Sequence, residues 1–501
     1  MLIKWTTISG CCAAILFLIS CSASKPAFDP GRKYDPATLE KDFNLFQGIL
    51  EEYHPSLYWF TSKDSIDHYF DRGRQQLKDS LTEPQFRNVL QQVITQVRCG
   101  HTSVRYSKAY TNYLDTAKLK TFPLSIKVWQ DTMAVIGNLI RRDTILRRGT
   151  IINSINGISF QQFRDTFLNY LVTDAHALNG KYQTLSTRGN FGVLYRNVFG
   201  LSTSFRVGYI DSTGNEAFTV LPVYDPSTDT LRRTFPPTVN SQRGVPRQVM
   251  VNGARNIQID TTLSTAYMTV NTFSRGNKLR PFFRQGFREI NKHSIRHLIV
   301  DVRSNGGGDA GLSTLLTRYL ITKEFKIADS LYAIRRSGKY NKYIKKHLLY
   351  RTAMFFVTRK KKDRRYHFVH FEKHVYKPKR KNHFDGDIYI ITGGNSFSAT
   401  TLFAKALQHQ KNVLIVGEET GGGAYGNTAW MIPEAQLPLT GLRFRLPLFR
   451  LVMDKEAVAT GRGVFPDIDV TPTVESLKRN IDPKSEKVKQ IIIERNKLRL
   501  R

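Results

Sequence analysis

The spacing of apolar residues changes along the chain and divides it into regions. From Leu39 to Tyr53, apolar residues recur every three or four positions, which is the spacing of a helix with one buried face. The same spacing returns after Thr82, a residue type that caps helix N-termini, and it continues to Val97. Residues 39–118 are therefore predicted to form a helical N-terminal domain.

A period of two follows the helical region. Apolar and polar residues alternate between positions 122 and 128, which indicates a strand. The stretch "GTIINSINGISFQQF" (149–163) then contains a strand, an Asn-Gly turn and the start of another strand. Residues 119–225 are therefore predicted to form a β-rich domain.

Continuous apolar runs mark the last large region. "HLIVDV" (297–302), "DIYIIT" (387–392) and "NVLIVG" (412–417) are typical of strands that are covered on both faces. Stretches with helical spacing lie between them, so residues 256–475 are predicted to form an α/β domain with right-handed crossovers.

Each of these runs leads into a glycine-rich loop: "RSNGGGD" (303–309), "TGGNSFS" (392–398) and "GEETGGGAYG" (417–426). Ligands bind beyond the carboxyl ends of the strands in such sheets, so these loops are the predicted functional site. The third loop has the glycine spacing of a dinucleotide-binding turn. It leads into strand-like sequence with prolines instead of a helix, which excludes that interpretation.

Two serines, Ser396 and Ser398, stand just before a helical run. A serine there can cap the helix, but one cap leaves the other hydroxyl unexplained. The free amides of a first helical turn can also stabilise an oxyanion, and the backbone of 306–308, all glycine, can approach closely enough to add a second donor. Nucleophilic catalysis by one serine is therefore a candidate function.

Four stretches in order carry a family resemblance: "LIVDVRSNGGG", "GGNSFSATTLFAKAL", "VGEETGGG" and "GRGVFPDIDV". Together they resemble the tail-specific (C-terminal processing) serine peptidases, especially the branch related to the tricorn core, over roughly residues 260–472. The resemblance implies a crotonase-like (ClpP/crotonase) α/β peptidase core, a PDZ-like domain at 119–225, and cleavage of unstructured or C-terminal peptide segments. The implied mechanism needs neither a metal nor an organic cofactor.

The resemblance also implies roles for individual residues. By position, Ser398 is the nucleophile, and the oxyanion hole is formed by the backbone N–H groups of Gly307 and Ala399. The better-known branch has a lysine base at the position of Gly423, so that base is absent here.

The tricorn-like branch instead uses a histidine in a "D-G-H-T" stretch, and "CGHT" (99–102) matches it with His101. An imidazole with an ordinary pKa of about 6.5 can accept and return a proton at neutral pH. The branch's orienting glutamate falls at Thr460, so the nearby Glu456 is the candidate acid.

The N-terminus is typical of an exported protein. In "MLIKWTTISGCCAAILFLISCSASK", a lysine precedes an apolar run, and "LISC" resembles the bacterial lipobox. Lipidation at Cys21 would anchor the chain in the bacterial envelope, facing the periplasm. An ordinary cleaved signal or an anchor helix are the alternatives. After processing at Cys21, Cys99 is the only other cysteine left, so no disulfide framework or CxxC metal site is expected.

The chain is strongly basic, with 75 Lys and Arg against 41 Asp and Glu. Of the Lys and Arg residues, 18 lie between Leu331 and Lys381, interleaved with aromatic residues. No nucleic-acid module surrounds this block, so we interpret it as an insertion that faces anionic lipid or glycan.

The predicted division of the chain is as follows: a lipoprotein signal peptide (1–20), a tether (21–38), a helical domain (39–118), a PDZ-like domain (119–225), a linker (226–255), the peptidase core (256–475) with its basic insertion (331–381), and a basic C-terminal tail (476–501). The main hypothesis is an envelope-anchored serine endopeptidase. The alternative is a catalytically inactive lipoprotein of the same fold that binds peptides or other envelope ligands, which Thr460 and Cys99 at the acids' positions favour.

Overall fold

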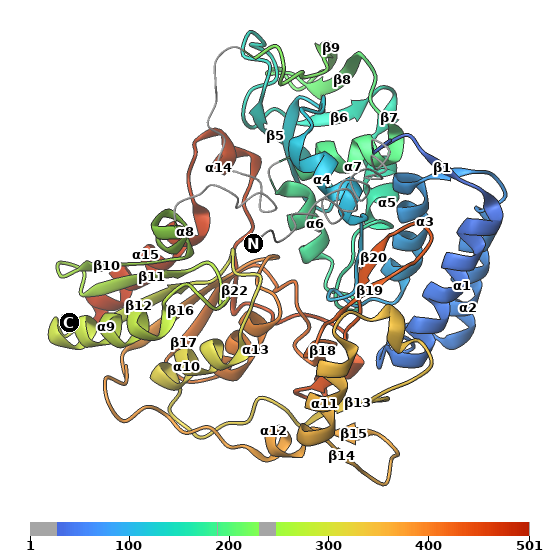
Figure 1. The fold of residues 1–501 in the computed structure, drawn as a ribbon. Helices are drawn as coiled ribbons and strands as arrows, with labels where there is room; N and C mark the ends of the chain where they lie inside the picture. Colours follow the sequence, from blue (N-terminus) through green and yellow to red (C-terminus); the bar gives the residue numbers. More distant parts are fainter. Residues whose placement is uncertain (1–27, 188, 230–246, 500–501) are drawn as a thin grey trace, which may run out of the picture.

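The computed structural model describes residues 28–187, 189–229 and 247–499 (Figure 1). The predicted signal peptide and Cys21 lie outside the described residues, as does most of the predicted linker. Within the described residues, no helix combines the length and apolar character needed to cross a bilayer.

Three helices form most of the N-terminal region: α1 (Pro36–Tyr53), α2 (Lys63–Gln75) and α3 (Glu83–Gln96). The apolar spacing predicts α1 and α3, whereas α2 was not predicted. Each begins after a polar cap, and the Asp35 carboxylate accepts the Thr38 N–H at the start of α1. The short strands β1 (Lys33–Tyr34) and β2 (Leu81–Thr82) pair beside these helices. On the buried face of α1, the Phe46 ring lies 5.1 Å from that of Phe444. Phe444 belongs to residues 247–499, the predicted catalytic half of the chain.

The middle region is built from small sheets and helices. A hairpin of β4 (Leu124–Val128) and β5 (Met133–Asn138) accompanies a four-stranded sheet of order β7-β6-β8-β9. Asn156 and Gly157 turn the chain between β6 and β7, as predicted. The remaining bounds are α4 (Lys108–Thr116), β6 (Ile152–Ile155), β7 (Ile158–Ser159), α5 (Phe160–Leu168), α6 (Asn179–Ser186), α7 (Asn190–Phe199), β8 (Ser204–Ile210) and β9 (Glu216–Pro222).

A six-stranded sheet of order β10-β11-β12-β16-β17-β22 carries the catalytic half. Only β10 runs antiparallel to its neighbour, and the other five strands are parallel. The bounds are α8 (Arg247–Ala254), β10 (Arg255–Asp260), β11 (Thr265–Val270), α9 (Leu279–Lys292), β12 (His297–Asp301), α10 (Ala310–Leu320), β16 (Asp387–Thr392), α13 (Ala399–Leu407), β17 (Val413–Gly417) and β22 (Ile468–Asp469).

Helices cover both faces of this sheet, which explains its continuous apolar strands. Alternate strand residues pack against α9, α10 and α13 on one face, and the intervening residues pack against the last helix, α15 (Pro483–Arg499), on the other. The region expected to be a basic tail therefore contains α14 (Val474–Lys478) and α15, and Val488 and Ile492 of α15 are buried against the sheet.

The basic insertion is folded onto a second, five-stranded sheet of order β14-β15-β13-β21-β18. The elements of the insertion and of this sheet are β13 (Ser330–Ala333), α11 (His347–Val357), β14 (Arg359–Lys360), β15 (Tyr366–His367), α12 (Val369–Lys373), β18 (Gly426–Asn427) and β21 (Arg450–Val452). The insertion therefore adds structure beside the catalytic loops.

A three-stranded sheet joins two regions that are far apart in the sequence. Strand β20 (Arg443–Arg445) pairs with β19 (Glu434–Gln436) on one side and with β3 (Val104–Arg105) on the other. Phe444 lies opposite Val104, so the segment just after the "CGHT" stretch is fixed to the catalytic half.

Replacing Phe444 by Ala tests this junction. The ring is fully buried, so its removal should lower the free energy of unfolding by about 3–5 kcal/mol, and His101 should lose its position. Denaturant unfolding followed by circular dichroism, together with peptide hydrolysis, would measure both effects. The control Phe218→Ala removes a ring that is 61% exposed and should change neither. Equal stability of the two variants would contradict the role of this junction.

Candidate active site

Ser398 stands where strand β16 turns into helix α13. Its backbone has φ 57° and ψ −120°, a conformation that a residue with a Cβ adopts only when its surroundings impose it. Its hydroxyl makes no capping hydrogen bond and is available for chemistry. The Ser396 hydroxyl is buried instead, where it donates to the Val302 carbonyl at 2.9 Å and accepts the Gly393 N–H at 3.2 Å. Ser396 is therefore structural.

His101 meets Ser398 although 297 positions separate them in sequence. The distance from His101 Nε2 to Ser398 Oγ is 3.0 Å, and the imidazole is buried against the Phe397 ring, whose centroid lies 4.7 Å away. A Cβ on Gly100 would lie 2.6 Å from the Phe397 ring, so this approach depends on a glycine. The structure thus brings together a hydroxyl and a base that can activate it.

Asp174, which no sequence pattern indicated, faces the other imidazole nitrogen. Its Oδ1 lies 4.0 Å from His101 Nδ1 and accepts the Gly100 N–H at 2.7 Å. Within the described residues, His101 Nδ1 and Asp174 Oδ2 are both buried without a hydrogen-bond partner. Asp174 lies in a loop, and the Ala175 N–H to Arg98 carbonyl hydrogen bond of 2.9 Å ties that loop to the "CGHT" corner.

Glu456, the candidate acid from the sequence, is not brought to this site. It is exposed in a surface turn, where its backbone N–H donates to Asp454. Thr460 is exposed as well. The carboxyl group that faces His101 therefore comes from Asp174, in the middle region of the chain.

Burial controls the protonation of this pair. Desolvation, with a smaller contribution from the Arg445 charge, lowers the pKa of His101 to about 3, so the imidazole is neutral at physiological pH. Burial raises the pKa of Asp174 to about 7. The resting site is thus a neutral base beside a carboxyl group that loses its proton near neutral pH.

Cys99 completes the only group of possible metal ligands found in the described residues, with His101 and Asp174; their ligand atoms lie within 4.8 Å of one another. Burial raises the pKa of the Cys99 thiol to about 11, so it is a neutral thiol instead of a nucleophile. A metal on His101 Nδ1 would occupy the nitrogen that faces Asp174. The arrangement therefore suits acid–base chemistry better than metal binding.

The two predicted oxyanion donors differ in their resting state. The Ala399 amide is the first of helix α13 and has no acceptor within the described residues. The Gly307 amide donates to Asn305 Oδ1 at 2.9 Å. Gly307 has φ 96°, and a Cβ there would lie 2.8 Å from the Ser398 Cβ, so the loop does approach the serine closely.

A cavity of about 860 Å³ opens beside Ser398 and His101. The glycine loop 306–308 and the segment 430–432 both line it. Trp430 and Met431 have φ values of 63° and 43°, so strained backbone lies at the cavity as well as at the serine.

Comparison with known proteins shows similarity in family and in fold. A family model described as Peptidase family S41 matches residues 264–470. Mature CPAF complexed with lactacystin is similar in structure, with 12% identity over 91% of this chain and 98% of that chain, at a TM-score of 0.61. Mature CPAF alone is 13% identical over 91% of this chain and 96% of that chain, at a TM-score of 0.60. A CPAF mutant is 12% identical over 91% of this chain and 96% of that chain, at a TM-score of 0.62. No curated protein matches the chain in sequence.

These matches define the fold: the chain shares the fold of mature CPAF, with a helical N-terminal region and several small sheets. Residues 264–470 match the model of Peptidase family S41, and a match to that family implies a serine-type peptidase. The family resemblance in the sequence is thereby confirmed at this level.

Asp174→Asn tests the position that faces His101. Without a carboxylate to stabilise the imidazolium, kcat should fall on the order of 10³- to 10⁴-fold. Wild-type activity should rise with pH through about 7 as Asp174 ionises, and the Asn variant should lack this rise. Glu456→Gln, the control, should retain wild-type kcat.

The stability of the same variant separates catalysis from structure. The fold holds the Asp174 proton more tightly than the unfolded chain, with an ordinary pKa of 3.8. The resulting stabilisation is present below pH 3.8 and is lost as pH rises through about 7. Asp174→Asn should therefore melt higher than wild type at pH 8. A lower melting temperature with wild-type kcat would contradict the assignment.

Proposed function

We propose that the protein is an envelope-anchored endopeptidase that cleaves unstructured or C-terminal peptide segments with Ser398 as nucleophile and His101 as base. The observation that carries this proposal is the 3.0 Å contact between the two side chains at the cavity of a family S41 domain.

The reaction begins with proton transfer. His101 Nε2 takes the Ser398 proton as Oγ attacks the peptide carbonyl carbon, and the resulting imidazolium passes that proton to the leaving amine. Water then hydrolyses the acyl-enzyme by the same route in reverse. The gap of 4.0 Å between His101 Nδ1 and Asp174 is too long for a hydrogen bond, so it closes to about 3 Å when the imidazolium forms.

The oxyanion is held by backbone N–H groups. The Ala399 amide is available, and the Gly307 amide becomes available when it leaves Asn305 Oδ1. Substrate binding in the glycine loop supplies the reason for that exchange, because the developing negative charge is a stronger acceptor than the neutral amide oxygen.

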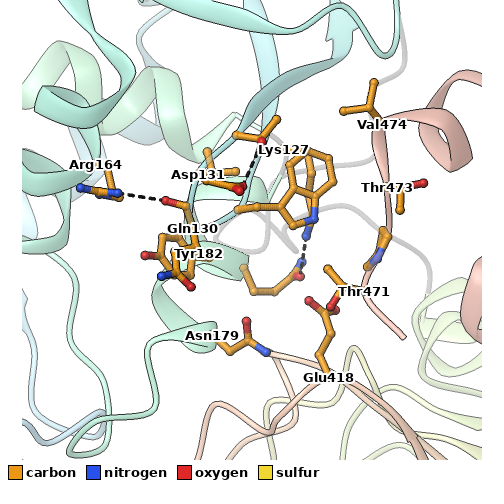
Figure 2. A pocket seen from close by; sticks show the side chains of 15 residues that line it. Lys127, Gln130, Asp131, Arg164, Asn179, Tyr182, Glu418, Thr471, Thr473 and Val474 are labelled. Carbon is orange, nitrogen blue, oxygen red and sulfur yellow. Dashed lines mark hydrogen bonds between the residues drawn. The ribbon is translucent and has the colours of Figure 1, made fainter. Parts of the chain in front are cut away.

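The middle region is proposed to bind peptide as a PDZ-like domain. A second cavity, of about 730 Å³, lies where this region meets the catalytic half (Figure 2). Figure 2 shows Lys127, Tyr182 and Asn179 from the middle region near Glu418 and Thr471 from the catalytic half. Asn179 also donates to the Glu419 carbonyl at 3.1 Å, so a ligand there would contact a loop that packs against the serine loop.

Ser398→Ala is the direct test of the peptidase. The variant should fold normally, fail to react with a fluorophosphonate reagent, and lose casein cleavage by a factor of about 10⁵ or more. Ser396→Ala is a poor control because its hydroxyl is structural, so Thr116→Ala, which removes an exposed hydroxyl that does not line the cavity, is preferable. Wild-type cleavage by Ser398→Ala would reject the proposed nucleophile. Saturable peptide binding without any turnover by the wild-type protein would select the inactive-receptor alternative.

Membrane attachment is proposed at two places. The first is lipidation of Cys21, which the N-terminal sequence supports. The second is helix α11 in the basic insertion, where one continuous helical face carries exposed apolar side chains: Leu348 and Leu349 at 63%, Phe355 at 60% and Phe356 at 70%.

Charge complementarity favours anionic lipid as the partner of this face. Exposed basic residues lie in α11 or within five positions of it in sequence: Lys346, Arg351, Arg359, Lys360 and Lys362. Each basic residue near an anionic bilayer contributes about 1 kcal/mol, and each buried Leu or Phe about 1.5–3 kcal/mol. A second copy of the chain would place two basic surfaces against each other, which disfavours self-association through α11.

Release from cell membranes tests the first attachment, and vesicle sedimentation tests the second. Cys21→Ala should release the full chain from cell membranes in part. Residues 28–501 should still bind vesicles containing phosphatidylglycerol and not neutral vesicles, and salt should weaken the binding. Replacing Leu348, Phe355 and Phe356 by Ser should abolish it, whereas Phe218→Ser should not. Equal binding to neutral vesicles would reject the lipid assignment.

A further inference from the structure

Within the described residues, the catalytic cavity contains one half-buried cation without a counter-charge. Three arginines line it: Arg275, Arg280 and Arg445. Arg275 is paired with Asp309 at 2.5 Å and is 88% exposed, and Arg280 is also exposed. Arg445 is half-buried, and within the described residues its guanidinium makes no ion pair or hydrogen bond.

The sheet explains why Arg445 is unpaired. Along β20, Phe444 enters the core, while Arg443 and Arg445 lie on the opposite side. Glu434 lies directly across the ladder from Arg445, but that carboxylate already pairs with three other cations: Arg105 at 3.8 Å, Arg443 at 3.1 Å and Lys345. No carboxylate is left for Arg445.

Arg445 is also close to the reacting groups. Its backbone N–H donates to the Ser103 carbonyl at 3.0 Å, two residues after His101. Its charge is strong enough at His101 to contribute to the lowered pKa of the imidazole. A half-buried guanidinium without a partner costs free energy in the resting protein, because it loses hydration and gains no ion pair.

We propose that Arg445 binds a carboxylate of the peptide substrate, either an acidic side chain near the scissile bond or the free C-terminal carboxylate. This inference rests on the proposed function, since it requires a peptide in the cavity beside Ser398. The planar guanidinium matches a carboxylate with two parallel hydrogen bonds, which a neutral or basic group cannot form.

Polar residues such as Thr272 and Ser274 line part of this cavity, and apolar and aromatic side chains line another part: Ile327, Phe371, Tyr376, Leu402, Trp430 and Met431. Burial among such groups strengthens an ion pair relative to water and leaves a misplaced charge unpaired. The expected substrate therefore combines a carboxylate with bulky apolar side chains close to the cleaved bond.

Binding a carboxylate would also change the base. Arg445 disfavours the imidazolium form of His101, and a bound carboxylate offsets that charge. The proton affinity of His101 thus increases when an acidic substrate is in place, which is when it must take the Ser398 proton. Acidic substrates should for this reason gain in kcat as well as in binding.

Matched peptides test the inference. Fluorogenic peptides that carry Glu or Gln at successive positions around the cleaved bond, and peptides that end in a free acid or an amide, would be compared by kcat/KM. The wild-type protein should prefer the carboxylate by about 10- to 100-fold in one of the two series. The series that shows the preference identifies which carboxylate Arg445 binds.

Substitutions then assign the preference to one residue. Arg445→Gln should reduce the ratio to near one, and Arg445→Glu should reverse it in favour of Lys over Glu, a gain that a misfolded variant cannot show. Arg280→Gln, an exposed arginine of the same cavity, is the matched control and should keep the preference. A wild-type ratio near one, or a preference that survives Arg445→Gln, would overturn the inference.

Binding measurements separate this inference from the proposed function. Fluorescence anisotropy with the Ser398→Ala protein reports the Kd ratio of the same peptide pairs without turnover. Absence of hydrolysis by wild type with a Kd ratio that depends on Arg445 would reject only the peptidase mechanism. Hydrolysis without any carboxylate preference, in rate or Kd, would reject only the role of Arg445.

Discussion

The contact between His101 and Ser398 is the constraint on which the rest of the structure depends. The two side chains are 297 positions apart in the sequence, and neither lies on an element that could bring it to the other alone. The pairing of β3 with β20 fixes the segment after His101, and Gly100 lets that segment approach the Phe397 ring. The strained Ser398 backbone then presents the hydroxyl to the imidazole. The six-stranded sheet thus positions Ser398, and the small sheet of β3 and β20, together with Gly100, positions His101.

The site contains polar groups that lack hydrogen-bond partners or counter-charges. His101 Nδ1 and Asp174 Oδ2 are buried without hydrogen-bond partners within the described residues, and Arg445 lacks a carboxylate there. Each of these groups would be hydrated in the unfolded chain, so each lowers the stability of the fold. All three lie around one reacting centre. Polar groups left unpaired in the resting state can bind a substrate or a charged intermediate without first breaking other interactions.

Much of the fold could be predicted because it follows from local patterns. The helical period near Leu39, the Asn-Gly turn and the continuous apolar strands each correspond to observed elements. The family resemblance led to Ser398 and His101, which the structure brings together. Asp174 could not be predicted, because its role comes from a loop contact with the Arg98 carbonyl and no motif marks it. The candidate Glu456 was chosen by closeness in sequence, which says nothing about spatial approach. The final segment was expected to be a tail because its charges conceal the few apolar residues, such as Val488, that pack on the sheet.

Helix α15 has a consequence for the order in which the molecule is made. Its Lys484 is buried, where Nζ donates to the Thr392 carbonyl at 2.9 Å and pairs with Glu418 at 2.7 Å. Thr392 is the last residue of the strand that leads into the serine loop, so this loop rests on a helix that is synthesised after both reacting side chains. A nascent chain that has already emerged as far as the third glycine-rich loop contains both reacting side chains and still lacks the support beneath one of them. Synthesis of α15, and not of the nucleophile, therefore sets the earliest moment at which the complete site can exist.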